Sequence, residues 1–263
     1  MWSFFKLQAK VRFKSPELIF PIIFPLVLTL LFGSYFESDS EVTRAYGALI
    51  ALSIMQGGLF GMGFTLIDTK ESVLMKRVGA TSITKRGILI GLMMVTLIVM
   101  LITLLWQTIL FAIFSGTGIF NNYDMQWGQI AWGGFIFGII IGAALSLSIG
   151  MFFAVVSKDQ NTFSTYAFLY FFGAAFLGGM MVPNSGIPWT RYVGYVFPSS
   201  WNANLIMGAS LGGDVFNFAN GYGSTVIVGA DSVQGWEAAY NCFMPILFIP
   251  FMFYIDNKLF KID

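Results

Sequence analysis

Histidine is absent from this 263-residue chain, and cysteine occurs once, as Cys242. Because histidine is the most versatile general base near neutral pH and the commonest metal ligand, its absence excludes the usual histidine-dependent catalytic and metal sites. A single cysteine excludes an internal disulfide framework and a cysteine metal cluster. The chain also contains no Gly-Lys pair. It therefore lacks the P-loop, G-x-x-x-x-G-K-[ST], which binds nucleotide phosphates.

Charge is scarce as well. Charged residues make up 10% of the chain and hydrophobic residues 57%, whereas an ordinary globular chain carries about 25% charged residues. A helix needs about 20 apolar residues to cross a bilayer. Six runs are long enough, and they predict an all-α membrane protein with a single domain over residues 1–263. The predicted spans are 18–36, 45–67, 88–114, 132–156, 161–182 and 237–255.

The few basic residues predict the orientation. With the N-terminus in the cytoplasm, all Lys and Arg residues except Arg44 and Arg191 fall on the cytoplasmic side, as the positive-inside rule requires. We therefore expect a multi-pass protein of the cell membrane with both termini in the cytoplasm. Before the first span, Lys6, Lys10 and Lys14 share one face at helical spacing. This pattern favours an N-terminal helix lying at an anionic membrane surface.

Small residues recur every four positions along the fourth span. Such spacing lets a partner helix approach closely, backbone against backbone. The partner helix belongs either to the same subunit or to a second subunit, and the sequence leaves both open. The stripe consists of Gly134, Gly138, Gly142, Ser146 and Gly150.

The segment between spans five and six is too apolar for a solvated loop and too interrupted to span. Its first half predicts short re-entrant or interfacial helices on the extracellular side, one of them opened by Pro188 and ended by Pro198. No role follows for the loop 212–236. Residues 208–212 match the nucleophile pattern G-x-S-x-G around Ser210, but that chemistry needs a histidine base. We interpret the match as chance.

The cores of the six spans contain no Lys, Arg, Asp or Glu away from their ends. Ion and proton pathways usually display such groups, so a proton-coupled antiporter is disfavoured. Amide side chains near the spans are limited to Gln56, Gln107 and Asn241. Each predicts either a hydrogen bond between helices or a contact with substrate.

Seven charged residues fall within positions 68–87, which form the main cytoplasmic loop in the predicted topology. Asp68 and Glu71 have the spacing of a capping box, and Gly79 is placed to end a helix. They predict a short helix over residues 69–78. A helix of this length needs external support. It is either a basic flank on anionic lipid or a docking helix for a soluble partner.

Two stretches resemble the type-2 ABC exporter permeases. "DTKESVLMKRVGATSITKRGILIG" is similar to the first cytoplasmic loop of that family, with an acidic residue, a Leu-x-Lys pair and a turn of the "GATP" type. "FLGGMMVPNSGIPWTRYVGYVFPSSW" is similar to the family's fifth span and the re-entrant segment after it. Ser82 departs from the family, in which many members have proline at this position.

The resemblance implies a permease subunit without an ATPase site or cofactor of its own, since ATP would bind a separate ATPase subunit. Two permease chains, identical or different, would pair with two ATPases and export a drug, antimicrobial peptide, lipid or glycan. The helix at 69–78 would be the coupling helix. Its expected contacts with the ATPase are Glu71, Leu74, Met75, Lys76, Arg77 and Val78. A membrane scaffold or a membrane-embedded enzyme is the alternative.

Overall fold

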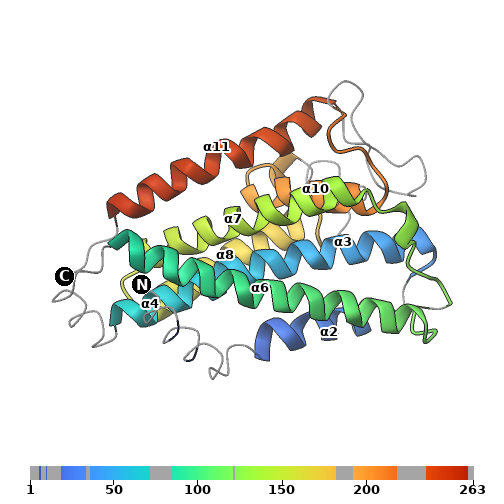
Figure 1. Cartoon of the computed structure of the whole chain (residues 1–263), viewed down its shortest axis with the longest axis horizontal. Coiled ribbons are helices and arrows are strands. Elements are labelled where there is room, and N and C mark those ends of the chain that lie inside the picture. Colours follow the sequence, from blue (N-terminus) through green and yellow to red (C-terminus); the bar gives the residue numbers. More distant parts are fainter. Residues whose placement is uncertain are drawn as a thin grey trace.

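The structure, a computed structural model, describes residues 6, 10, 19–33, 36–71, 85–120, 122–181, 192–217 and 235–259. Within these ranges every regular element is a helix and no strand occurs. Most of the long helices run side by side along the length of the molecule (Figure 1). The predicted all-α class is therefore confirmed for the part of the chain described. The predicted N-terminal interfacial helix lies outside it, apart from the exposed Lys6 and Lys10.

Each predicted apolar run contains a helix. In chain order the elements are α2 (Ile19–Gly33), α3 (Asp39–Gln56), the π-helix η2 (Gly57–Met62), α4 (Gly63–Glu71), α6 (Lys85–Ser115), the short 3-10 helix η3 (Trp127–Gln129), α7 (Trp132–Val156), α8 (Gln160–Leu177), α10 (Pro198–Ser210) and α11 (Gly235–Leu259). Four helical stretches are long and apolar enough to cross a membrane: Asp39–Lys70, Gly87–Ser115, Trp132–Val156 and Trp236–Asp256. Helices α2 and α8, with 15 and 18 residues, are not among these four.

One long helix forms the centre of the bundle. Helices α3, η2 and α4 follow one another without a break from Asp39 to Glu71, and 94% of the apolar window in this stretch is buried. The Ser38 side chain caps its start by accepting a hydrogen bond from the Glu41 N–H at 3.3 Å. Acidic residues in the first turn also favour the helix N-terminus. The helix thus begins before the predicted apolar run 45–67.

The predicted helix start at Asp68 is wrong. Asp68 lies inside α4, which continues to Glu71, and the Thr69 hydroxyl donates to the Thr65 carbonyl at 2.6 Å. The preceding turn of helix already supplies carbonyl partners for the N–H groups here, so no new cap is needed. Residues 72–84, which include most of the predicted coupling helix, lie outside the described residues.

The π-helix η2 lies in the middle of this central helix and is rich in glycine. π-Helices are rare and often occur as single turns at functional positions. A Cβ on Gly58 would meet the Ser146 side chain, and a Cβ on Gly57 would lie 2.7 Å from Cγ of Met100. The glycines therefore allow α7 and α6 to approach η2 from two sides.

Helix α10 is buried against α3, α7 and α11, and Figure 1 shows it beside α7. The predicted helix before Pro198 is described only in part: residues 192–194 are helical and this helix stops before Pro198, which itself stands in the first turn of α10. A proline has no N–H to lose at that position, and its fixed φ suits the first helical residue. Residues 182–191, including Pro188, lie outside the described ranges.

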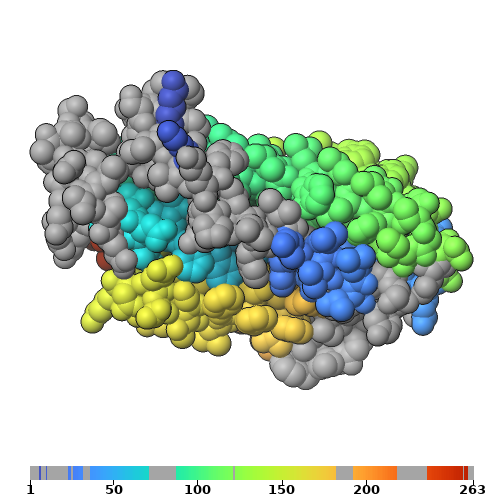
Figure 2. Space-filling model, turned by 90° about the horizontal axis from the view of Figure 1, so that it is seen from below, coloured from blue at the N-terminus to red at the C-terminus, as the bar shows by residue number. Residues whose placement is uncertain are grey.

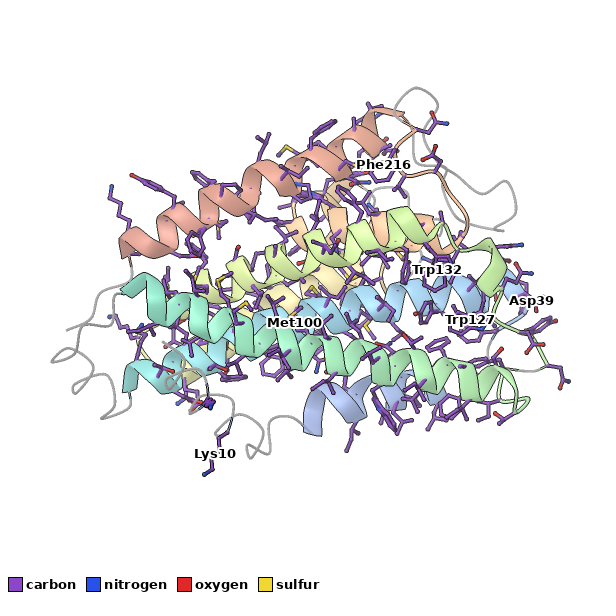
Figure 3. All side chains as sticks on the ribbon, in the orientation of Figure 1. Lys10, Asp39, Met100, Trp127, Trp132 and Phe216 are labelled. Carbon is purple, nitrogen blue, oxygen red and sulfur yellow. The ribbon has the colours of Figure 1, made fainter. Side chains whose placement is uncertain are left out.

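Aromatic packing closes the core at the end of the bundle opposite α4. Tyr46 stacks on Phe135 at 5.7 Å between ring centroids and meets Phe111 edge-on at 5.2 Å. Asp39 lies at this end, near Trp127 and Trp132 (Figure 3). Its carboxylate accepts a hydrogen bond from the Asp124 N–H at 2.9 Å, which fastens the connection between α6 and α7.

The outer helices present apolar side chains to the surroundings. Leu105 on α6 is 65% exposed and Leu169 on α8 is 74% exposed. The space-filling view shows α6 and α8 along one side of the molecule, with part of α2 beside α6 (Figure 2). Such surfaces suit contact with lipid hydrocarbon, since the bilayer takes the place of a soluble protein's aqueous surroundings.

Candidate functional site

The candidate site is the end of the bundle from which residues 72–84 leave α4 and return to α6. Figure 1 shows the end of α4, the start of α6 and the end of α11 at this same end of the molecule. Of the predicted ATPase contacts, Glu71 is the last residue of α4. The other five, Leu74, Met75, Lys76, Arg77 and Val78, lie outside the described residues. The described part of the site therefore consists of the helix ends around this segment.

Lys70 joins α4 to the end of α7. Its Nζ donates to the Ala154 carbonyl at 3.2 Å and to the Ser157 carbonyl at 3.3 Å. The last carbonyls of a helix have no partner within the helix and carry the negative end of its dipole. The Lys70 ammonium gives these carbonyls a hydrogen-bond donor and places a positive charge at the negative end of the dipole. Sequence reasoning gave Lys70 no contact with a helix end, because Ala154 lies 84 positions further along the chain.

The connection from α7 to α8 is short and well hydrogen-bonded. The Ser157 N–H and hydroxyl both donate to the Phe153 carbonyl, at 3.0 and 2.6 Å. Two residues later, the Asp159 carboxylate caps α8 by accepting from the Thr162 N–H at 2.8 Å. This hydrogen bond lowers the pKa of the exposed Asp159 carboxyl. Lys70 is therefore bound to a tight turn that begins α8 as well as ending α7.

Helix α4 also packs directly on α8. Phe64 and Phe163 meet edge-on with ring centroids 5.0 Å apart. A Cβ on Gly63 would overlap the Phe163 ring, so the glycine makes room for that aromatic side chain. The Lys70 ammonium and the contact between Phe64 and Phe163 thus both link α4 to its neighbours α7 and α8.

The small-residue stripe of α7 is filled by side chains and backbone of the same chain. A Cβ on Gly134 would lie 2.6 Å from Val215, and one on Gly138 would lie 2.8 Å from Ile206. Further along, Gly142 faces Asn202. The end nearest the candidate site packs on η2: a Cβ on Gly150 would lie 2.5 Å from the Gly58 carbonyl oxygen, and Ser146 lies against Gly58.

Polar side chains are buried between the helices. The Ser53 hydroxyl on α3 donates to the Gln107 Oε1 on α6, so Gln107 makes the expected hydrogen bond between helices. Gln56 is 2% exposed, and neither its Oε1 nor its Nε2 has a hydrogen-bond partner among the described residues. Asn241 is fully buried on α11.

Asp256 is a buried carboxylate that the sequence did not single out. It directly follows the predicted span 237–255, where a residue at the membrane boundary is expected to be hydrated. The structure instead extends α11 to Leu259 and leaves Asp256 0% exposed. Neither carboxylate oxygen has a hydrogen-bond partner among the described residues. A buried acidic residue without such a partner is costly for folding.

Ser210, in the G-x-S-x-G match, ends α10 and is fully buried. Its hydroxyl donates to the Met207 carbonyl at 2.7 Å, a contact within its own helix. Across the described ranges, no three His, Cys, Asp or Glu side chains lie close enough together to hold a metal ion.

The chain matches a known protein family. The model of a family described as "ABC-2 type transporter" matches residues 1–211. No curated protein matches the chain. The matched region contains every described helix except α11, together with the whole of the segment 72–84.

Proposed function

Because the chain belongs to the ABC-2 type transporter family, whose members are the membrane components of ABC transporters, we propose that it is the permease subunit of an ATP-driven exporter. It is a multi-pass membrane protein, and family membership implies an ABC ATPase as its partner. The observation that carries the proposal is the family match over residues 1–211.

In this proposal ATP binding and hydrolysis belong to the partner. The chain has no P-loop and no Gly-Lys pair, so it binds no nucleotide phosphate by that motif. It needs no cofactor of its own. Two permease chains and two ATPase subunits form the working exporter, and six spans bring both termini to the cytoplasmic side.

In this proposal the contact with the ATPase lies within residues 71–78, at the end of α4 and directly after it. Charge concentrates around it, with seven charged residues between positions 68 and 87 of a chain that is otherwise apolar. A membrane protein needs such a surface where it contacts a soluble partner. The neighbouring helix ends support this role, because Lys70 fastens the last turn of α4 to α7. Motion of the segment thereby has a path into the membrane.

The cargo is an amphiphilic molecule: a drug, an antimicrobial peptide, a lipid or a glycan. The four helices that qualify as spans carry few charges, and three of them, all but the central helix, present many apolar side chains outward. These properties favour a cargo that enters from the membrane leaflet. They would also serve a scaffold or a membrane-embedded enzyme, the alternative function, so the experiment below separates these functions.

The proposal is tested by purifying the tagged chain from its native membrane and identifying the proteins that remain bound. An ABC ATPase should co-purify, and ATP hydrolysis should follow that subunit, while the isolated chain hydrolyses no ATP. Leu74→Asp places a charge on the apolar side of the predicted coupling helix. The cost of burying it, about 1–3 kcal/mol, should remove the ATPase or abolish export without reducing the amount of protein in the membrane.

Lys85→Ala, at the start of α6, is the control and should retain the partner. Hydrolysis of ATP by the chain alone would contradict the assignment of the ATPase site to a partner. If no ATPase is bound to the wild-type chain, the scaffold or enzyme function is favoured instead.

A further inference from the structure

The central helix carries one cation near each of its ends, and both cations bind carbonyl groups at the end of a neighbouring helix. Lys70 in α4 donates to the Ala154 and Ser157 carbonyls at the end of α7. At the opposite end, Arg44 in α3 donates to the Gly179 carbonyl, just after α8, at 3.2 Å. The same helix is thus fastened to α7 at one end of the bundle and to the end of α8 at the other.

The two attachments differ in what lies next to them. Glu71 alone separates Lys70 from residues 72–84, the segment that meets the ATPase in the proposed function. Arg44 lies 26 positions earlier in the chain, at the far end of the bundle. A displacement of the segment therefore acts directly on the end of α4 that carries Lys70, whereas Arg44 lies at the opposite end of the central helix.

The contacts of Lys70 are suited to passing on a displacement. One ammonium group binds two carbonyl oxygens at the end of α7, those of Ala154 and of the C-cap residue Ser157, and the Phe153 carbonyl just before them accepts from the Ser157 hydroxyl. Ala154 and Ser157 are both buried, at 0% and 2% exposure. Because hydrogen bonds from a charged donor are stronger than neutral ones, and water has little access here, α7 and α4 are held as one body at this end.

We propose that Lys70 is a positioning residue of the transport cycle: through the Ala154 and Ser157 carbonyls it makes the cytoplasmic ends of α7 and α8 follow the movement of α4. The inference rests on the proposed function, since the ATPase supplies that movement. Without Lys70, the ATPase would still move α4, but α7 and the turn to α8 would no longer move with it.

The experiment measures movement of the turn in the purified complex with its ATPase. In a Cys242→Ser background, spin labels are attached at Lys158→Cys, in the turn between α7 and α8, and at Lys258→Cys, near the end of α11. Both lysines are exposed. Labelled chain is diluted with unlabelled chain, so that each complex holds one labelled copy. Pulsed electron paramagnetic resonance then gives the distance between labels without nucleotide and after trapping with ATP and vanadate.

With Lys70 present, the distance should change on trapping. Lys70→Met should keep the ATPase bound but lose at least half of that change, and Lys70→Arg, which keeps a cationic donor, should restore it. Arg44→Met is the matched control: it removes the same kind of contact at the far end and should leave the change intact. If the lost hydrogen bonds only destabilised the protein, Lys70→Met and Arg44→Met would alter the label distance to a similar extent, and they would do so both without nucleotide and in the trapped state.

The inference would be overturned if Lys70→Met showed the same distance change on trapping as the wild-type chain. It would also be overturned if Lys70→Arg lost as much of that change as Lys70→Met. Should Lys70→Met fail to assemble, Lys70→Gln retains one neutral donor and must show an intermediate change for the inference to stand. Failure of the wild-type chain to bind any ATPase is a different result, because it refutes the proposed function rather than the contact of Lys70.

Discussion

Gly150 has no room for a side chain, because the atoms facing it belong to the backbone of another helix. A Cβ there would lie 2.5 Å from the Gly58 oxygen, 2.7 Å from the Leu59 oxygen and 2.9 Å from the Leu59 Cα. A flexible side chain could turn away, but a helical backbone moves only as a unit. Gly133 in the same helix is the opposite case, since an added Cβ meets nothing within 4 Å.

Gly150→Ala should therefore lower the free energy of unfolding by about 1–3 kcal/mol, the usual cost of overpacking. Gly133→Ala should leave it unchanged or raise it slightly, since alanine favours the helix. Thermal and denaturant unfolding of the purified variants in detergent gives both values. Equal stability of the two variants would show that α7 and η2 are further apart than the structure places them.

Between elements, the contacts that matter are polar as well as apolar. Helices α3 and α6 are linked inside the bundle by the hydrogen bond from Ser53 to Gln107 and, nearer the Asp39 end, by the one between Tyr46 and Thr108 at 3.0 Å. In a bilayer the apolar surfaces of helices gain little from meeting each other, since lipid is equally apolar. Hydrogen bonds and close packing at glycines therefore fix which helices are neighbours.

Removing one partner of the Ser53–Gln107 hydrogen bond should lower the free energy of unfolding more than removing both partners. Ser53→Ala leaves both polar atoms of the Gln107 amide without a partner and should lower stability by about 0.6–1.7 kcal/mol. The double variant Ser53→Ala/Gln107→Leu should recover part of that loss, because no buried amide remains. Unfolding in detergent of the single and double variants measures the coupling.

Ser164→Ala serves as the control for this cycle, because the half-buried Ser164 hydroxyl donates to the Gln160 carbonyl of its own helix, at 2.8 Å, and links no second helix among the described residues. It should change stability little. Additive effects of Ser53→Ala and Gln107→Leu would mean that the two side chains do not interact.

For the whole molecule, the proposed topology of six spans depends on which helix ends lie at the same end of the bundle. The contact of Lys70 with Ser157 puts the end of α4 and the turn between α7 and α8 at one end of the bundle. Asp39 and the connection before α7 lie at the other end (Figure 3). A chain that crosses the membrane six times exposes these two ends on opposite sides.

Single cysteines in the Cys242→Ser background should show this topology. Gln129→Cys and Tyr192→Cys should react with a membrane-impermeant maleimide added outside intact cells. Lys158→Cys and Lys258→Cys should react only after the membrane is opened. All four side chains are exposed, so burial does not limit their labelling. Labelling of positions 129 and 158 from the same side would rule out α7 as a span.

The sequence by itself determined the class of the protein and much of its outline. Apolar length predicts a membrane protein because each stretch must be long enough to cross the hydrocarbon layer, a property of consecutive residues. The run 132–156 coincides with α7, and a helix lies in each of the other five runs. The resemblance to type-2 ABC transporter permeases, drawn from two short motifs, is confirmed by the family match.

Only the tertiary structure decided how the helices meet. It shows that the stripe from Gly134 to Gly150 is occupied by α10 and η2 of the same chain, that Asp256 is buried, and that Lys70 binds the end of α7. A sequence pattern gives the spacing of residues along one helix, but it does not identify the helix that packs against them. Lys70 and Ala154 are 84 positions apart, so their contact exists only because packing of the whole bundle brings two helix ends together.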